Sequence, residues 1–384
     1  LNVRVPNERR GDYMAQIAAN RLGNRRLTEL FKKWSKKEIE LGCSGIIDAV
    51  TRRMRSSIAE LPDGEYKFED VLDDDGMGTE NIPVVVKIVK QGEEIWLDFE
   101  GSGRQVRGNM NNSFAGLQAS VLFALKVLVD PDGPTNHGML EPVHIKAPDG
   151  SVVNASFPAA TAARAQTCQR IIDVILGALA EAVPDRVIAA CNGANGVATF
   201  SGIGPDGKYD LYMETIGGGA GGRSYKDGSD GIQVHVTNTS NLPVEALENE
   251  YPLLVDRYEL IEGSGGAGKW RGGLGLRRVY RGLNHTLTFS GQGERAVKAP
   301  WGLFGGESGG TASISLHYDD GKKESLAIKP ASLEVEPNVA VCIETAGAGG
   351  YGPPAERDIE SLQDDARSGK FNAEFMRKFY NFQN

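Results

Sequence analysis

Residues 209–223 read YDLYMETIGGGAGGR, and this pattern of a strand followed by glycines is typical of the second half of the chain. The first eight residues are typical of a short strand, and a cluster of glycines follows at once. Beyond this point short strands alternate with glycine-rich loops, and most of the 49 glycines lie after residue 190. The other strands that we predict here cover residues 232–236, 276–280, 286–290, 313–317 and 339–344. This texture indicates a β-rich half without tandem repeats.

The preceding half is dominated by helices instead. Apolar residues recur at helical spacing over residues 7–34, 44–59, 113–129 and 164–181. Between the second and third of these segments, residues 84–89 and 95–99 flank Gln91-Gly92, which predicts a β-hairpin. We therefore predict an α+β protein: a helical and mixed α/β N-terminal half followed by a glycine-rich, β-rich C-terminal half. The regions that we expect are a helical segment (1–60), a mixed α/β region with an acidic hairpin (61–190), a glycine-rich β domain (191–352) and a C-terminal helical tail (353–384).

Composition excludes several classes of protein. The net charge is −9, so nucleic acid is not expected as a partner, because binding to phosphates needs a basic face. No run of eighteen apolar residues occurs, which argues against a transmembrane helix. The four cysteines are scattered without a C-x-x-C pair, and no signal peptide is evident. We therefore expect a cytoplasmic protein, without disulfides or a structural zinc site.

Two glycine motifs resemble nucleotide-binding signatures without completing them. Residues 263–270 read GSGGAGKW, where a P-loop needs Ser or Thr after the lysine to hold Mg²⁺ and a helix after the loop. Here Trp270 follows Lys269, and a strand is predicted next. Residues 202–207 match G-x-G-x-x-G but contain Pro-Asp-Gly between two strands, which indicates a turn. We interpret both as structural turns.

The glycine cluster after Glu214 is the sharpest candidate for a functional site. Glycines let a backbone approach a ligand closely, and such a loop can direct N–H groups at an anion. A carboxylate precedes the cluster and Arg223 follows it. The alternative is a loop that only packs tightly, and the sequence favours neither. His235 ends a predicted strand near Glu245, where it could belong to a catalytic cluster or be an ordinary buried histidine.

Metal and thiol chemistry find little support in the sequence. The five histidines make no H-x-x-x-H or H-E-x-x-H pattern, so we expect no metal ligands from this chain. Cys168, Cys191 and Cys342 have no base partner nearby in the sequence.

Several stretches together resemble the hydantoinase B/5-oxoprolinase family. The similar segments run in order along nearly the whole chain: residues 2–6, 11–20, 97–102, 142–158, 214–231, 238–245, 263–275 and 349–358. The resemblance implies a B-type subunit that works with a hydantoinase A-type ATPase subunit, which binds ATP and Mg²⁺. Such pairs open cyclic amides such as hydantoins, 5-oxoproline or caprolactam. Two other readings stay open: a subunit of an ATP-dependent ketone carboxylase of the acetone or acetophenone type, and a non-catalytic scaffold for the ATPase.

The glycine cluster, its flanking charges and the strand predicted to end at His235 supply our candidate site residues. The catalytic residues that we predict are Glu214, Arg223 and His235. The substrate-binding residues that we predict are Gly217, Gly218, Gly219, Asp227, Asn238 and Glu245.

One departure from the family concerns metal. Family members carry G-G-T-H-x-x-D and H-H-A-D motifs before the segment that resembles residues 2–6, and no histidine precedes His137 here. The resemblance thus implies that the ligands of a divalent metal such as Zn or Mn lie in an N-terminal segment outside this chain. We expect that segment to be a separate or cleaved polypeptide in a hetero-oligomer.

Overall fold

The N-terminal half is built on a four-stranded sheet with two helices packed on it. The computed structural model describes residues 3 and 5–382. The strands follow the order β1-β2-β3-β4, antiparallel except for the parallel pair β3 and β4. Their bounds, and those of the two helices, are β1 Gly64–Asp74, β2 Glu80–Gln91, β3 Glu94–Asp98, β4 Val143–Lys146, α3 Phe114–Val129 and α4 Arg164–Ala178. The predicted hairpin and both predicted helices are thereby confirmed, with α4 ending three residues early.

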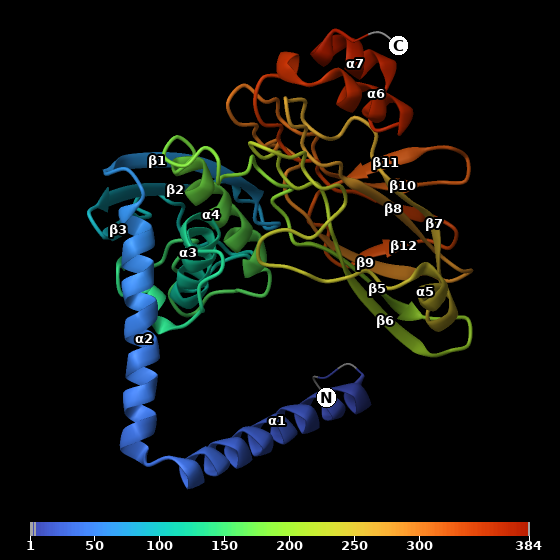
Figure 1. The fold of residues 1–384 in the computed structure, drawn as a ribbon. Coiled ribbons are helices and arrows are strands. Elements are labelled where there is room, and N and C mark those ends of the chain that lie inside the picture. The colour runs from blue at the N-terminus through green and yellow to red at the C-terminus, as the bar shows by residue number, and fades with distance from the viewer. Residues whose placement is uncertain (1–2, 4, 383–384) are drawn as a thin grey trace.

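Two long helices precede this sheet as an arm. Helix α1 (Pro6–Lys33) runs away from the body, and α2 (Lys36–Ala59) returns along the sheet (Figure 1). A capping box of Ser35 and Glu38 fixes the start of α2. Helix α2 buries Val50, Met54 and Ile58, whereas α1 buries no residue. The apolar residues at helical spacing on α1 therefore face solvent in this chain.

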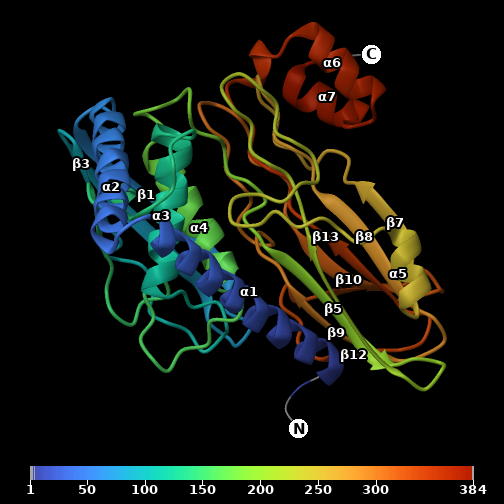
Figure 2. The same ribbon diagram turned by 60° about the horizontal axis from the view of Figure 1, so that its bottom comes forward.

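The C-terminal half contains a sandwich of two antiparallel sheets (Figure 2). One sheet has the order β12-β9-β5-β6 and the other β11-β10-β13-β8-β7. The core between them is apolar and includes Phe200, Tyr280, Phe289 and Val341. The strand bounds are β5 Gly196–Ile203, β6 Tyr209–Ile216, β7 Leu253–Leu260, β8 Leu276–Gly282, β9 Leu287–Gln292, β10 Ser313–His317, β11 Lys323–Leu326, β12 Leu333–Val335 and β13 Ala340–Glu344, with helix α5 Val244–Glu250 between β6 and β7.

One predicted strand is wrong. Residues 232–236 form no strand, because His235 has a left-handed backbone with φ of 51°. That conformation is incompatible with an extended ladder. The segment keeps one isolated β-bridge, between Ile232 and Gly218.

A layer of glycine-rich segments joins the two halves. We call residues 217–231, 263–275, 301–310 and 345–352 the glycine layer; Figure 2 shows these segments side by side. Their backbones bond to one another directly, for example from Ala348 N–H to the Gly273 carbonyl at 3.0 Å. A Cβ atom on Gly219 would lie 2.1 Å from the Gly273 oxygen. Glycine is thus needed here because backbones touch each other, which favours the packing alternative for this loop.

Two helices close the chain above the glycine layer, α6 (Ile359–Arg367) and α7 (Ala373–Tyr380) (Figure 1). Two short 3-10 turns, His137–Met139 and Pro354–Glu356, complete the elements. Among the described residues, no helix is long and apolar enough to cross a membrane. The predicted α+β class, with helices first and glycine-rich β structure after, is confirmed.

Candidate functional site

A cavity of about 640 Å³ lies where helices α3 and α4 meet the glycine layer. Its apolar wall comes mainly from helix α3, from Val187 and Ile188 after helix α4, and from Val234. Its polar groups include two of the three predicted catalytic residues, Arg223 and His235. The main lining residues are Phe123, Val127, Leu128, Asp185, Arg186, Ile188, Cys191, Ala220, Arg223, Tyr225, Gln233, Val234 and His235.

His235 reaches the cavity from a strained position. Its left-handed backbone is unusual for a residue with a side chain, and such strain is often found at functional sites. The imidazole is 4% exposed, and its Nε2 lies 3.1 Å from Oδ1 of Asp173 on α4. The Phe123 ring packs edge-on against the imidazole, with 6.0 Å between ring centroids.

The surroundings of His235 favour its charged form. Burial, the largest influence, lowers the pKa, but the Cys191 sulfur and the Asp173 carboxylate outweigh burial and raise the pKa of His235 above its ordinary value. The ring is then an imidazolium at neutral pH. Because Nε2 faces Asp173, Nδ1–H is the group of the ring that is left to donate to a ligand in the cavity.

Sequence reasoning missed Asp173 and gave Cys191 no base partner. Asp173 stands in α4 between buried apolar neighbours, and only 1% of it is exposed. A lone acid inside an apolar helical stripe was the signal that could have found it. Cys191 is buried beside Ala220 and Val234, and its sulfur accepts a hydrogen bond from Gly221 N–H at 3.4 Å.

Arg223 brings a second cation to the cavity. It belongs to the glycine layer, and its backbone pairs with Ile188 and Lys226. Its guanidinium makes no hydrogen bond or ion pair with any residue that the structure describes. The guanidinium is therefore available for an anionic or oxygen-rich ligand.

Glu214 lies elsewhere, in the core between the two sheets. Its carboxylate accepts hydrogen bonds from Arg278, from the Tyr280 hydroxyl and from Leu242 N–H. Burial and the Glu214 charge together raise the pKa of Tyr280. The glutamate does not line the cavity, so its role as a catalytic group stays a prediction.

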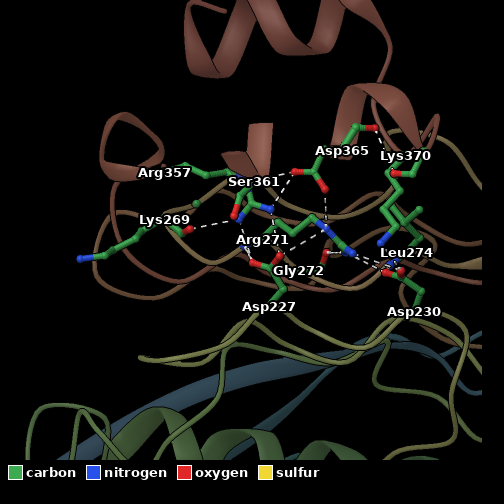
Figure 3. A network of polar contacts seen from close by, with 12 residues as sticks. Asp227, Asp230, Lys269, Arg271, Gly272, Leu274, Arg357, Ser361, Asp365 and Lys370 are labelled. Carbon is green, nitrogen blue, oxygen red and sulfur yellow. Dashed lines mark hydrogen bonds and ion pairs between the residues drawn. The ribbon is translucent and has the colours of Figure 1, made fainter. Parts of the chain in front are cut away.

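Asp227 belongs to a network of ion pairs that we call the tail network, drawn in Figure 3. Arg357 donates to both of its oxygens, at 2.8 and 2.9 Å. Arg271 pairs with Asp230 at 2.7 Å and with Asp365 of α6 at 3.2 Å. The members are Asp227, Asp230, Arg271, Arg357, Asp365 and Lys370. The network fastens α6 to the glycine layer, and it uses the carboxylate that we predicted for substrate.

The other predicted binding residues do not line the cavity either. Gly217, Gly218 and Gly219 pack against backbone and side chains inside the glycine layer. Asn238 and Glu245 are exposed, and Glu245 stands in the first turn of α5. Substrate binding by these residues stays a prediction.

No group in the described part of the chain fits a metal. No three His, Cys, Asp or Glu side chains of those residues converge in a way that could hold an ion. The near-P-loop also differs from a nucleotide site, since Trp270 pairs with Tyr351 and strand β8 follows. Lys269 lies at the surface and pairs with Glu356 at 3.3 Å.

The chain is similar to a known protein family and to several known proteins. A family model described as hydantoinase B/oxoprolinase matches residues 1–354. An uncharacterized protein of Methanocaldococcus jannaschii is 38% identical over 97% of this chain and 64% of its own length. The 5-oxoprolinase 1 of Arabidopsis thaliana is 32% identical over 91% of this chain and 28% of its own length.

A solved structure agrees with these relatives. The crystal structure of the ATP-dependent caprolactamase from Pseudomonas jessenii matches with a TM-score of 0.89 at 26% identity, covering 100% of this chain and 68% of that chain. The chain spans less than two thirds of the length of the Methanocaldococcus jannaschii and Arabidopsis thaliana relatives. On the extent of the family match, the chain belongs to the hydantoinase B/oxoprolinase family.

Proposed function

We propose that this chain is part of the B-type subunit of an ATP-dependent amidohydrolase that opens a cyclic amide. The observation that carries the proposal is the cavity in which a buried His235–Asp173 pair and the free Arg223 guanidinium meet an apolar wall. The names of two relatives, 5-oxoprolinase and caprolactamase, point to cyclic amides as substrates. A lactam or hydantoin ring has the same mixture of apolar and polar surface.

The residues of the cavity suit the hydrolysis step, in which water attacks the carbonyl carbon and the ring C–N bond breaks. Phe123 and Val127 supply apolar contacts for the ring carbons. Arg223 and the His235 imidazolium supply positive charge for the oxygen that becomes negative as water attacks the carbonyl carbon. When the ring C–N bond breaks, the amide nitrogen needs a proton, which Nδ1–H of His235 can donate; the imidazole then regains a proton from the water that has attacked the carbonyl carbon.

Cofactors and partners follow from the family rather than from this chain. We propose that ATP and Mg²⁺ bind to a hydantoinase A-type subunit in a hetero-oligomer, which works in the cytoplasm. A divalent metal such as Zn or Mn would need ligands from the part of the relatives' length that this chain does not span. Whether that part is continuous with the chain, separate or cleaved does not alter the role of the cavity.

The test compares two buried histidines in the assembled enzyme. Ring opening and ADP formation are measured with 5-oxoproline, hydantoin and caprolactam, for His235→Asn and for His285→Asn. His285 bonds to the Leu283 carbonyl outside the cavity and serves as the matched control. We expect ring opening to fall about 100-fold, or ~2.7 kcal/mol of barrier, in His235→Asn alone.

Three results would contradict the proposal. Equal turnover in both variants would remove the cavity from the chemistry. A requirement for bicarbonate would indicate the ketone carboxylase instead. Phosphate release that is independent of every substrate, and unchanged without this chain, would indicate the scaffold.

A further inference from the structure

A chain of alternating charges runs through the protein behind His235. We call its members, Asp70, Arg170, Asp173, Glu294, Arg295 and Lys329, the seam network, since it lies between the N-terminal half and the sandwich. Arg170 and Arg295 are completely buried, and both pair with the same Asp70 oxygen, at 3.0 and 2.9 Å. A buried charge destabilises the fold unless it has a partner of opposite charge. The role of each side chain in this network therefore depends on which partners it contacts.

Asp173 divides its two oxygens between two partners. Oδ2 accepts a hydrogen bond from Arg295 at 2.7 Å, while Oδ1 faces His235 Nε2 at 3.1 Å. A carboxylate held on one side by a guanidinium cannot turn away from the imidazole on the other. Arg295 therefore acts on the orientation of the ring through Asp173.

Arg295 is itself held in one place. Its backbone is left-handed, with φ of 66°, and its guanidinium passes over Gly193, where a Cβ atom would lie 2.5 Å from Nε. On the far side, Asp70 also accepts a hydrogen bond from the Trp301 indole at 3.2 Å. Burial alone would raise the pKa of Asp70, but the guanidinium groups of Arg170 and Arg295 outweigh it and lower that pKa, so the carboxylate stays charged.

We propose that Arg295 is a positioning residue, which holds the Asp173 carboxylate so that it orients the His235 imidazole toward the cavity. Arg295 touches no part of the cavity itself. The inference rests on the proposed function only for its catalytic consequence. The contact between Arg295, Asp173 and His235 can be tested without any substrate.

The experiment uses Arg170→Met as a matched control for Arg295→Met. Both arginines are fully buried and share Asp70, but only Arg295 bonds to Asp173. The charged or titratable groups around His235 and its partner include Asp173, Cys191 and Arg295, and Arg223 and Tyr225 line the same cavity. The Arg295→Lys variant keeps the positive charge and provides a folded reference if either methionine variant fails to fold.

The first readout is the imidazole N–H that bonds to Asp173, followed by proton NMR with ¹⁵N-labelled histidine. The chain has five histidines, so the His235 signal can be assigned by its loss in His235→Asn. We expect a protected, slowly exchanging Nε2–H in the wild type and in Arg170→Met. In Arg295→Met we expect it to exchange at least tenfold faster, with an intermediate rate in Arg295→Lys.

The second readout is turnover in the assembled enzyme. We expect kcat to fall at least tenfold in Arg295→Met while KM stays within twofold, with partial recovery in Arg295→Lys. An unchanged Nε2–H signal in folded Arg295→Met or Arg295→Lys would overturn the inference. Failure of the proposed function is a different result: the NMR signal would respond to Arg295, yet His235→Asn would retain full turnover.

Discussion

The seam network and the tail network are built alike but end differently. In each, two buried arginines share one aspartate: Arg170 and Arg295 share Asp70, whereas Arg271 and Arg357 share Asp227. The tail network ends on Asp365 in helix α6, and the seam network ends on an imidazole that lines a cavity. Buried charge alone therefore does not identify a site. What the last member of a network touches separates a structural fastening from a functional one.

The largest effect that we expect would come from breaking the tail network. Arg357→Met leaves Asp227 and Asp365 without one of their partners, and loss of one member of a buried pair costs about 3–5 kcal/mol. We expect the free energy of unfolding in urea to fall by about that amount, with turnover per folded molecule unchanged. Arg367→Met removes an exposed pair on helix α6, which carries Asp365, and should change neither quantity. Lost turnover in folded Arg357→Met would mean that the two networks do not divide as described.

The His235–Asp173 pair at the end of the seam network should instead make the free energy of unfolding depend on pH. The pKa of His235 is raised by its partners to about 10, so the folded protein favours the protonated ring. That contribution is complete below the ordinary histidine pKa near 6.5 and is lost as pH rises toward 10. We expect His235→Asn to reduce the unfolding free energy more at pH 6 than at pH 10, measured by urea titration at both values. An equal loss at both pH values would mean that the ring carries no extra proton in the folded state.

Glu214 extends this comparison to a buried acid that, unlike His235, does not line the cavity. Glu214→Gln keeps the shape and removes the charge opposite Arg278. Because the glutamine oxygen can still accept a hydrogen bond from Arg278, we expect a smaller loss, of about 1–2 kcal/mol in unfolding free energy, with turnover per folded molecule retained. A tenfold fall in turnover at an unchanged melting temperature would instead support the catalytic role that the sequence suggested.

The smallest effect is expected at the near-P-loop. Lys269 is at the surface and pairs only with Glu356 among the described residues, so Lys269→Ala should leave the ATP affinity of the assembled complex unchanged. Binding is measured by calorimetry with a non-hydrolysable ATP analogue. A tenfold weaker affinity would place the nucleotide on this chain.

Local patterns predicted the four long helical segments and most of the strands that they named, but not β1, β4, β5, β7, β11, β12 or α5, and they predicted the site only in part. Strand β6 was predicted with both of its ends, because alternation and the following glycines are written in the residues themselves. Arg223 and His235 do meet in one cavity, but the strand assumed for His235 is absent. Its imidazole meets Asp173, which lies 62 residues away in the sequence. No local pattern predicts such contacts.

The same limit explains why the sequence allows two interpretations of the glycine loop. A glycine needed for a ligand and a glycine needed for a neighbouring backbone look identical in the sequence. Only the structure shows that the neighbour of Gly219 is the peptide of Gly273.

The glycine layer also determines when the site can form during folding. Ala220 and Arg223 line the cavity, but the backbone around them bonds to segments as distant as Ala346 and Gly349. These partners are made more than a hundred residues later, so this wall of the cavity cannot form before residue 349 has left the ribosome. Contacts of such long range make folding slow, because a large loop must close before they can form. The site can therefore form only after the N-terminal sheet, whose four strands lie between residues 64 and 146.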